Sequence, residues 1–189
     1  MALFISIIIA YFIGALPFDW WVVTKPAYRL RPPSFSVLNR REAFVLIVID
    51  LVKGMAATLI GFSVAGWMGA YLAAVAVVVG SLYSVFLGFR GGTGIGVAAG
   101  ALLILSPLLI LIGILIYLFS LLTTRVLFVS TLLTTTAMII FAVVLATQIY
   151  VWMVIIVVGG LILYRIRPKW KRIKRFEPPY RFRNPFRLK

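Results

Sequence analysis

The chain has 189 residues, of which 63% are hydrophobic, and its formal net charge at pH 7 is +15. The remaining polar residues are too few to cover the surface of a soluble globular domain. The composition therefore indicates an integral membrane protein. The sequence contains no cysteine and no histidine, which excludes disulfides, thiolate metal sites, a cysteine nucleophile and a histidine general base.

Continuous apolar runs extend from residue 3 to residue 164, and this continuity favours an all-α, polytopic membrane fold. We expect one helical transmembrane domain over residues 1–164 and a basic juxtamembrane tail over residues 165–189. Within the domain we expect seven transmembrane segments, at Leu3–Val23, Ala43–Ala65, Trp67–Phe89, Gly94–Leu105, Pro107–Leu122, Val126–Thr147 and Ile149–Tyr164.

The fourth and fifth of these segments depend on a break at Ser106-Pro107. Proline suits the first turn of a new helix, where its missing N–H costs nothing. Without the break there are six spans, and Arg125 then lies on the opposite side of the membrane from the tail. The break makes Gly94–Leu105 a half-helix about 18 Å long, too short to cross the hydrocarbon core and therefore expected to be buried among its neighbours.

The distribution of positive charge favours seven segments with the N-terminus outside. Eleven of the 19 Lys and Arg residues follow Tyr164, and five more lie between Lys25 and Arg41. Seven segments place both clusters on the cytoplasmic side of the membrane, as the positive-inside rule requires. The tail is expected to lie on anionic lipid headgroups, and this placement disfavours nucleic acid as its partner.

A glycine-rich stretch from Gly80 to Gly100 lies at an expected membrane surface. It contains the sequence Arg90-Gly91-Gly92-Thr93-Gly94, followed by apolar residues. Glycines allow successive backbone N–H groups to face one anion, and a helix that starts after Gly94 adds its positive end. The same glycines also suit a tight turn between two packed helices, and the spacing leaves both explanations open.

Asp50 and Lys53 are three residues apart, so they lie on one face of the second segment and can neutralise each other. Charges inside a membrane usually mark function, but a self-paired Asp and Lys also suits a structural lock between helices. Asp19 lies near the cytoplasmic end of the first segment, where it can reach water.

Several motifs together resemble one family. They are Gly14-Ala15-Leu16-Pro17, Asp50-Leu51-Val52-Lys53-Gly54, the Gly80 to Gly100 stretch, Ser106-Pro107 and Thr124-Arg125. In this order they resemble the bacterial acyl-phosphate:glycerol-3-phosphate acyltransferases. The resemblance implies a seven-helix inner-membrane enzyme with a cytoplasmic active site. Such an enzyme moves an acyl group from acyl phosphate to glycerol 3-phosphate, making lysophosphatidic acid for phospholipid synthesis, without a metal or cofactor.

The resemblance also implies how the site would be assembled. Substrate phosphate would be held by the glycine loop and by nearby cations, at Arg90, Gly91, Gly92, Thr93, Gly94, Arg40 and Arg41. The catalytic residues stay unassigned, with Ser81, Asp50 and Lys53 as candidates.

This chain departs from the family where chemistry is expected. The family typically has a histidine at the position of Ser81, a lysine at that of Thr93, and an acid and an asparagine opposite Arg167 and Pro168. Losing positioned donors and bases costs on the order of 10²- to 10⁴-fold in rate each. The alternative is therefore a pseudoenzyme that binds lipid or a partner protein. A third hypothesis is a small transporter, which is suggested by Asp50, Lys53 and the half-helix.

Overall fold

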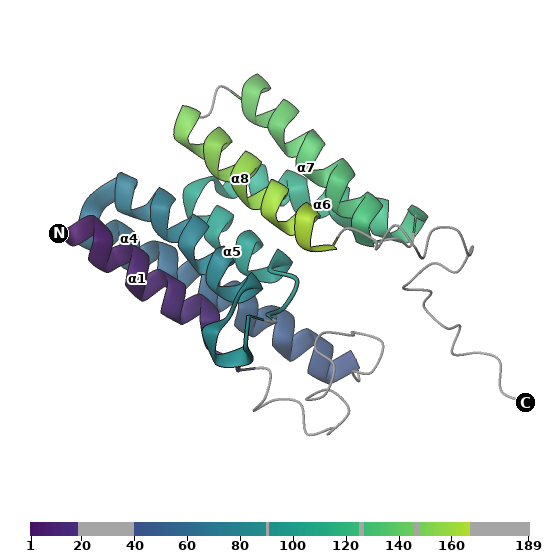
Figure 1. The fold of residues 1–189 in the computed structure, drawn as a ribbon. Helices are drawn as coiled ribbons and strands as arrows, with labels where there is room; N and C mark the ends of the chain where they lie inside the picture. The colour runs from purple at the N-terminus through teal and green to yellow at the C-terminus, as the bar shows by residue number, and fades with distance from the viewer. Residues whose placement is uncertain (19–39, 90, 125–126, 146–147, 167–189) are drawn as a thin grey trace, which may run out of the picture.

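The structure is a computed structural model that describes residues 1–18, 40–89, 91–124, 127–145 and 148–166. In these residues all regular structure is helical, as Figure 1 shows. The helices are α1 (Ala2–Ala15), α4 (Arg40–Leu82), the short 3-10 helix η2 (Val85–Leu87), α5 (Ile95–Leu105), α6 (Pro107–Thr124), α7 (Leu127–Val144) and α8 (Ile149–Ile166).

Helix α4 is divided by a sharp reversal at Ala65 and Gly66 into a first arm (residues 40–64) and a second arm (residues 67–82). Gly66 has φ 64° and ψ −156°, a conformation open essentially only to glycine. The two arms lie so close that a methyl group on Gly61 would come within 2.7 Å of the carbonyl oxygen of Gly69. The boundary predicted between the segments Ala43–Ala65 and Trp67–Phe89 is therefore confirmed, as a turn at Gly66.

The predicted break at Ser106-Pro107 is also confirmed. Helix α5 ends at Leu105, and α6 begins at Pro107. At 11 residues α5 is about 16 Å long, and five of its residues are buried. This burial is what a half-helix needs, because lipid offers no partner for the polar backbone groups at its ends.

The first and third predicted segments are wrong in length. Helix α1 ends at Ala15, not at Val23, because Pro17 forces Leu16 into an extended conformation with ψ 123°. The second arm of α4 ends at Leu82, not at Phe89. Beyond it the chain turns through η2, with Gly88 and then Phe89 in the left-handed region, at φ 58° and 61°. Asp19 lies outside the described residues.

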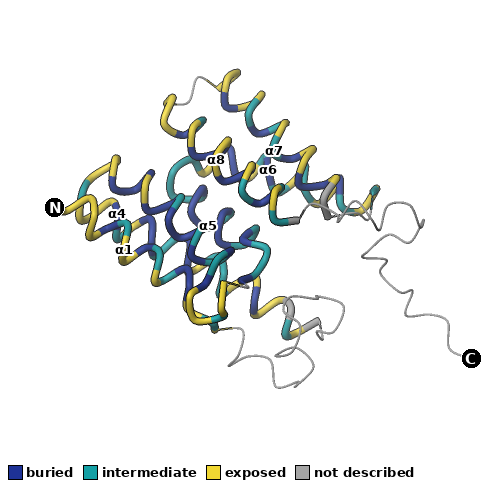
Figure 2. The backbone as a smooth tube through the Cα atoms, in the orientation of Figure 1, coloured by how far each residue is buried: buried dark blue, intermediate teal, exposed yellow. Residues whose placement is uncertain are grey.

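The helices form two groups, and in Figure 1 the group of α1, α4 and α5 lies below and to the left of the group of α6, α7 and α8. One group contains α1, α4 and α5, and the other contains α6, α7 and α8; α8 packs against α4, and α6 against α5. Figure 2 shows burial concentrated where these helices meet and exposure on their outer faces. Those outer faces carry large apolar side chains, among them Phe4, Leu115, Phe119, Leu122 and Val144.

Two described stretches, Phe44–Leu87 and Pro107–Thr124, are long and apolar enough to cross a membrane by length and composition. The first of these includes both arms of α4. An apolar exterior on such helices suits contact with lipid tails. The number of spans and the side on which each end lies stay predictions.

Candidate functional site

A small cavity of about 30 Å³ lies where α1 and the second arm of α4 end and α5 begins. Its lining comes from three stretches that are far apart in the sequence, residues 14–17, 50–53 and 81–94. The lining residues are Gly14, Ala15, Leu16, Pro17, Asp50, Lys53, Ser81, Ser84, Leu87, Gly92 and Gly94. The structure thus brings together five residues singled out in the sequence, namely Asp50, Lys53, Ser81, Gly92 and Gly94.

Lys53 is buried and ties the end of α1 to α4. Its Nζ donates a hydrogen bond of 2.8 Å to the carbonyl oxygen of Leu16 and lies 3.8 Å from Asp50 Oδ1. It also lies 4.9 Å from the centre of the Phe18 ring. The expected pairing of Asp50 with Lys53 is confirmed. Because the last carbonyls of a helix lack intrahelical donors, the ammonium group also stabilises the end of α1.

Asp50 lies against the first turn of α5. A methyl group on Gly96 would come within 2.8 Å of Asp50 Cβ, so glycine at this position lets the acid approach the helix. A carboxylate is favoured beside a helix N-terminus, where the backbone dipoles leave partial positive charge. Asp50 therefore joins α4 to α5, and it lines the cavity with about a third of its side chain exposed.

The glycine turn closes back onto the end of α4. The N–H of Gly91 donates to the carbonyl of Leu82 at 3.1 Å, and that of Gly92 donates to the carbonyl of Ser81 at 2.9 Å. A methyl group on Gly91 would lie 2.0 Å from the Ser81 oxygen, whereas one on Gly92 would meet nothing within 4 Å. The fold therefore requires glycine at 91 and does not require it at 92.

Helix α5 presents its N-terminal end to the same cavity. Gly94 precedes it with φ 71°, and the first helical hydrogen bond runs from the N–H of Ala98 to the carbonyl of Gly94 at 2.9 Å. The N–H groups before Ala98 have no acceptor within the helix. They make this end of α5 a place where a phosphate or carboxylate is electrostatically favoured.

Arg165, in the last turn of α8, reaches the site from the other group of helices. Its Nη2 donates to the carbonyl oxygen of Gly91 at 3.2 Å, and its guanidinium carbon lies 5.6 Å from the centre of the Tyr83 ring. The sequence does not mark Arg165 as a site residue, because the predicted basic tail begins at residue 165. The available signal was its position directly after the last apolar run, where the helix still continues.

The candidates also include three arginines and Ser81. Arg41 is exposed in the first turn of α4 and does not line the cavity, Arg40 begins that helix, and Arg90 lies outside the described residues. Ser81 lines the cavity and donates its hydroxyl to the carbonyl of Val78 at 2.9 Å. Within the described residues no three Asp, Glu, His or Cys side chains gather as metal ligands.

Comparison with known proteins points to one family. The family model described as glycerol-3-phosphate acyltransferase matches residues 34–175. A glycerol-3-phosphate acyltransferase of Thermoanaerobacter pseudethanolicus is 35% identical over 123 residues, covering 59% of this chain and 62% of that protein. One from Burkholderia pseudomallei is 36% identical over 123 residues, covering 58% and 60%. The matched part thus spans about three fifths of these relatives.

Solved structures agree over more of the chain. The crystal structure of PlsY, an integral membrane glycerol 3-phosphate acyltransferase, in its glycerol 3-phosphate form has a TM-score of 0.80 and is 26% identical, covering 92% of each chain. Its lysophosphatidic acid form has a TM-score of 0.77 with the same coverage.

Proposed function

Because the chain belongs to the glycerol-3-phosphate acyltransferase family, we propose that it transfers an acyl group from acyl phosphate to glycerol 3-phosphate and so makes lysophosphatidic acid. The observation that carries this proposal is the cavity at the start of α5. There the glycine turn, the free end of a helix and the Asp50–Lys53 pair meet. The positive helix end suits a phosphate, and the carboxylate suits a proton acceptor.

In this proposal the phosphate of glycerol 3-phosphate binds at Gly92, Thr93 and Gly94 and at the first N–H groups of α5. The space beside Gly92 admits a ligand to the backbone. Gly91 contributes as the turn residue that Arg165 holds through its carbonyl. Positive charge would come from Arg90, Arg40 and Arg41.

The reaction forms one bond and breaks another at the acyl carbon. The glycerol hydroxyl oxygen attacks that carbon, the bond from carbon to the phosphate oxygen breaks, and phosphate leaves with the bonding pair. Asp50 is the acid that lines the cavity, so we assign it as acceptor of the hydroxyl proton, with Ser81 beside it. Holding both substrates together supplies much of the remaining acceleration.

We place the enzyme in the bacterial inner membrane with seven segments, the N-terminus outside and the site on the cytoplasmic side. The apolar outer faces of the helices support a bilayer location. The excess of Lys and Arg in the tail supports this orientation and contact with anionic lipid headgroups.

A pseudoenzyme is the second candidate, and specific contacts favour it. The ammonium of Lys53 is already bonded to Leu16, and the amides of Gly91 and Gly92 are bonded to the end of α4. Groups engaged in this way hold the fold together and are not free to bind substrate. In that case the protein keeps the family architecture as a membrane scaffold that binds lipid or a partner protein.

The deciding experiment measures labelled lysophosphatidic acid made from labelled glycerol 3-phosphate and palmitoyl phosphate by the purified protein. The variants are Gly92→Val and, as control, Gly160→Val, since both positions have open space around the added carbon. We expect product from the wild-type protein and the control. For Gly92→Val we expect a loss of about 100-fold, the effect of displacing a substrate by about 1 Å.

Two outcomes contradict this proposal in different ways. Folded wild-type protein that makes no product overturns the acyltransferase assignment and supports the scaffold. Full activity in Gly92→Val supports the acyltransferase assignment but contradicts the binding of substrate phosphate at the glycine turn.

A further inference from the structure

An apolar groove of about 780 Å³ runs along the outer surface between α1 and α8, with the second arm of α4 as its floor. Ile8 and Tyr11 line it from α1, Met68, Ala76 and Val79 from α4, and Met153 from α8. Its volume falls within the range of about 300–1,000 Å³ that is typical of ligand pockets.

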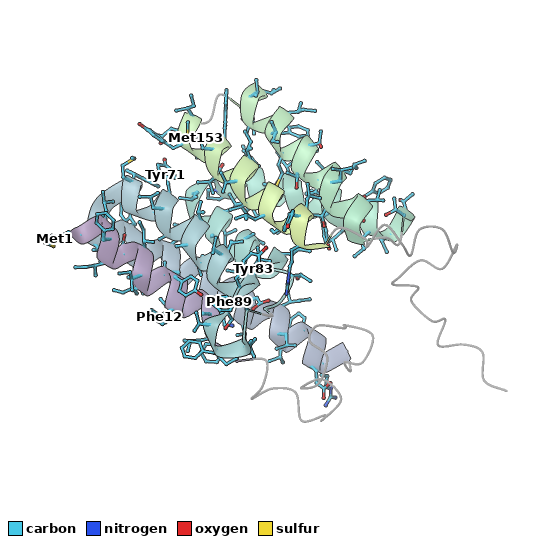
Figure 3. The ribbon with its side chains drawn as sticks, viewed as in Figure 1. Met1, Phe12, Tyr71, Tyr83, Phe89 and Met153 are labelled. Carbon is cyan, nitrogen blue, oxygen red and sulfur yellow. The ribbon has the colours of Figure 1, made fainter. Side chains whose placement is uncertain are left out.

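The two ends of the groove differ in chemistry. At one end the Tyr71 hydroxyl donates to Gln148 Oε1, and the ring of Tyr150 stacks with its centre 5.5 Å from that of Tyr71. At the other end the Tyr11 hydroxyl donates to the carbonyl of Tyr83 at 2.9 Å. Figure 3 shows Tyr71 and Met153 together at the first end, with Tyr83 toward the second.

A cation lies just beyond the Tyr83 end. The guanidinium of Arg165 lies 5.6 Å from the Tyr83 ring and holds the glycine turn through Gly91. A guanidinium has five N–H donors, more than the single hydrogen bond to Gly91 uses. The groove therefore leads from an aromatic end to a positive group attached to the candidate site, and this charge complements an anionic head on an apolar tail.

The length of the groove suits one acyl chain. Tyr71 lies on the second arm of α4 and Tyr83 directly follows its end, 12 positions later, which is about 18 Å at 1.5 Å per residue. One leaflet contributes about 15 Å of hydrocarbon, half of the bilayer core. An extended chain whose head lies at Arg165 thus reaches the cluster of Tyr71, Gln148 and Tyr150.

We propose that the groove holds the acyl chain of a phosphate-bearing, single-chain amphiphile, and that Tyr71 with its Gln148 partner limits the chain length accepted. The amphiphile is the acyl donor, so this assignment rests on the proposed function. The acyl chain enters the groove from lipid hydrocarbon and not from water, so the hydrophobic effect does not favour one chain length over another. Selection instead comes from packing along Ala76 and Val79 and from the obstruction at Tyr71.

Binding of n-alkyl phosphates, from octyl to octadecyl, tests the proposal without any turnover, because these compounds lack the acyl carbonyl. Each competes with hexadecyl phosphate carrying a photoreactive diazirine in its tail, in nanodiscs of phosphatidylcholine. Ala76→Phe places a ring half-way along the groove, and Tyr71→Ala opens the aromatic end. Leu118→Phe, on the exposed face of α6, is the control.

We expect cross-links between Met68 and Val79 in the wild-type protein. In Ala76→Phe, binding of hexadecyl phosphate relative to decyl phosphate falls by at least about fivefold, equivalent to the ~1 kcal/mol lower limit for overpacking. In Tyr71→Ala the preferred chain becomes longer, and in Leu118→Phe the length profile is that of the wild type. Each variant is first checked for a cooperative thermal transition.

Unchanged length profiles in both groove variants overturn the proposal. Cross-linking that unlabelled alkyl phosphate does not compete away also overturns it, because the groove then holds ordinary boundary lipid. Shifted chain-length profiles in a protein that makes no lysophosphatidic acid support the binding of an alkyl chain in the groove and contradict the acyltransferase assignment. Synthesis of lysophosphatidic acid with unshifted chain-length profiles supports the acyltransferase assignment and contradicts the binding of the acyl chain in the groove.

Discussion

The group of α1, α4 and α5 packs through its backbone, whereas the group of α6, α7 and α8 packs through side chains. In the first group, a methyl group on any of four glycines would lie 2.0–2.2 Å from a backbone carbonyl oxygen of another helix. The glycines, with the residue that each one meets, are Gly14 with Val77, Gly54 with Val97, Gly80 with Tyr11 and Gly100 with Leu51.

Two glycines of the second group meet side chains instead. Gly113 faces the sulfur of Met138, and Gly159 faces Thr135. Hydroxyl groups join α6 to α7, with Thr124 Oγ1 and Ser130 Oγ 3.1 Å apart. Side chains can change rotamer and a backbone cannot, so the first group is the rigid one. It holds most of the candidate site, and the second group contributes Arg165.

The strongest test of this contrast is Gly54→Ala. Its new methyl group would meet the carbonyl of Val97 at 2.1 Å, so we expect a stability loss of about 3 kcal/mol or more from overpacking. Gly160→Ala, with open space, should stay within about 1 kcal/mol of the wild type. Thermal unfolding in one detergent measures both. Equal transition temperatures would show that the α4–α5 contact is not rigid.

Lys53→Met tests the ionic connection within the first group. The change leaves the Leu16 carbonyl without its donor and Asp50 without its cation. We expect a loss of about 1–3 kcal/mol, the cost of unsatisfied buried polar groups. The double variant Lys53→Met with Asp50→Asn should recover part of the stability. If the single variant is as stable as the wild type, the pair is not a structural lock.

Arg165→Gln tests the connection between the two groups. Loss of the charged hydrogen bond to the carbonyl of Gly91 should let the glycine turn shift. We expect kcat/KM to fall about tenfold, or ~1.4 kcal/mol. The loss should appear in KM for glycerol 3-phosphate, through the glycine turn, and in KM for acyl phosphate, whose head we place at Arg165, with little change in thermal stability. Arg165→Lys should be intermediate, because lysine keeps the charge without the planar fork. A fall in stability without a change in KM would assign Arg165 to the fold alone.

The smallest effect belongs to the second group. Ser130→Ala removes the hydroxyl that lies beside Thr124 between α6 and α7. Hydrogen bonds between membrane helices contribute about 0.6 kcal/mol on average, and we expect a loss of that size. Thr136→Val, at an exposed position where the hydroxyl bonds within its own helix, is the control. A loss of stability larger than that of Lys53→Met would contradict the conclusion that the first group is the more rigid one.

Local chemistry made part of this structure predictable. The reversal at Gly66, the break at Pro107 and the start of α5 after Gly94 each follow from one residue and its neighbours. The end of α1 was missed because hydropathy does not register that Pro17 stops a helix inside an apolar run.

The site depends on contacts between distant parts of the chain. Gly91 and Gly92 bond to α4 only because that helix ends at Leu82, and Arg165 reaches Gly91 across 74 positions. The resemblance indicated which segments meet, and the periodicity of the sequence did not. Neither indicated the groove, because its walls come from helices that are neighbours only in space.

The sharp reversal at Gly66 also bears on how the chain enters a bilayer during synthesis. The two arms of α4 meet at Ala65-Gly66-Trp67, a turn without charge or a long polar loop. In the predicted orientation, a chain that inserts as this hairpin moves no ionised group to the far side and leaves Arg40 and Arg41 on the side of synthesis. The same glycine that brings the arms together would then also favour that topology.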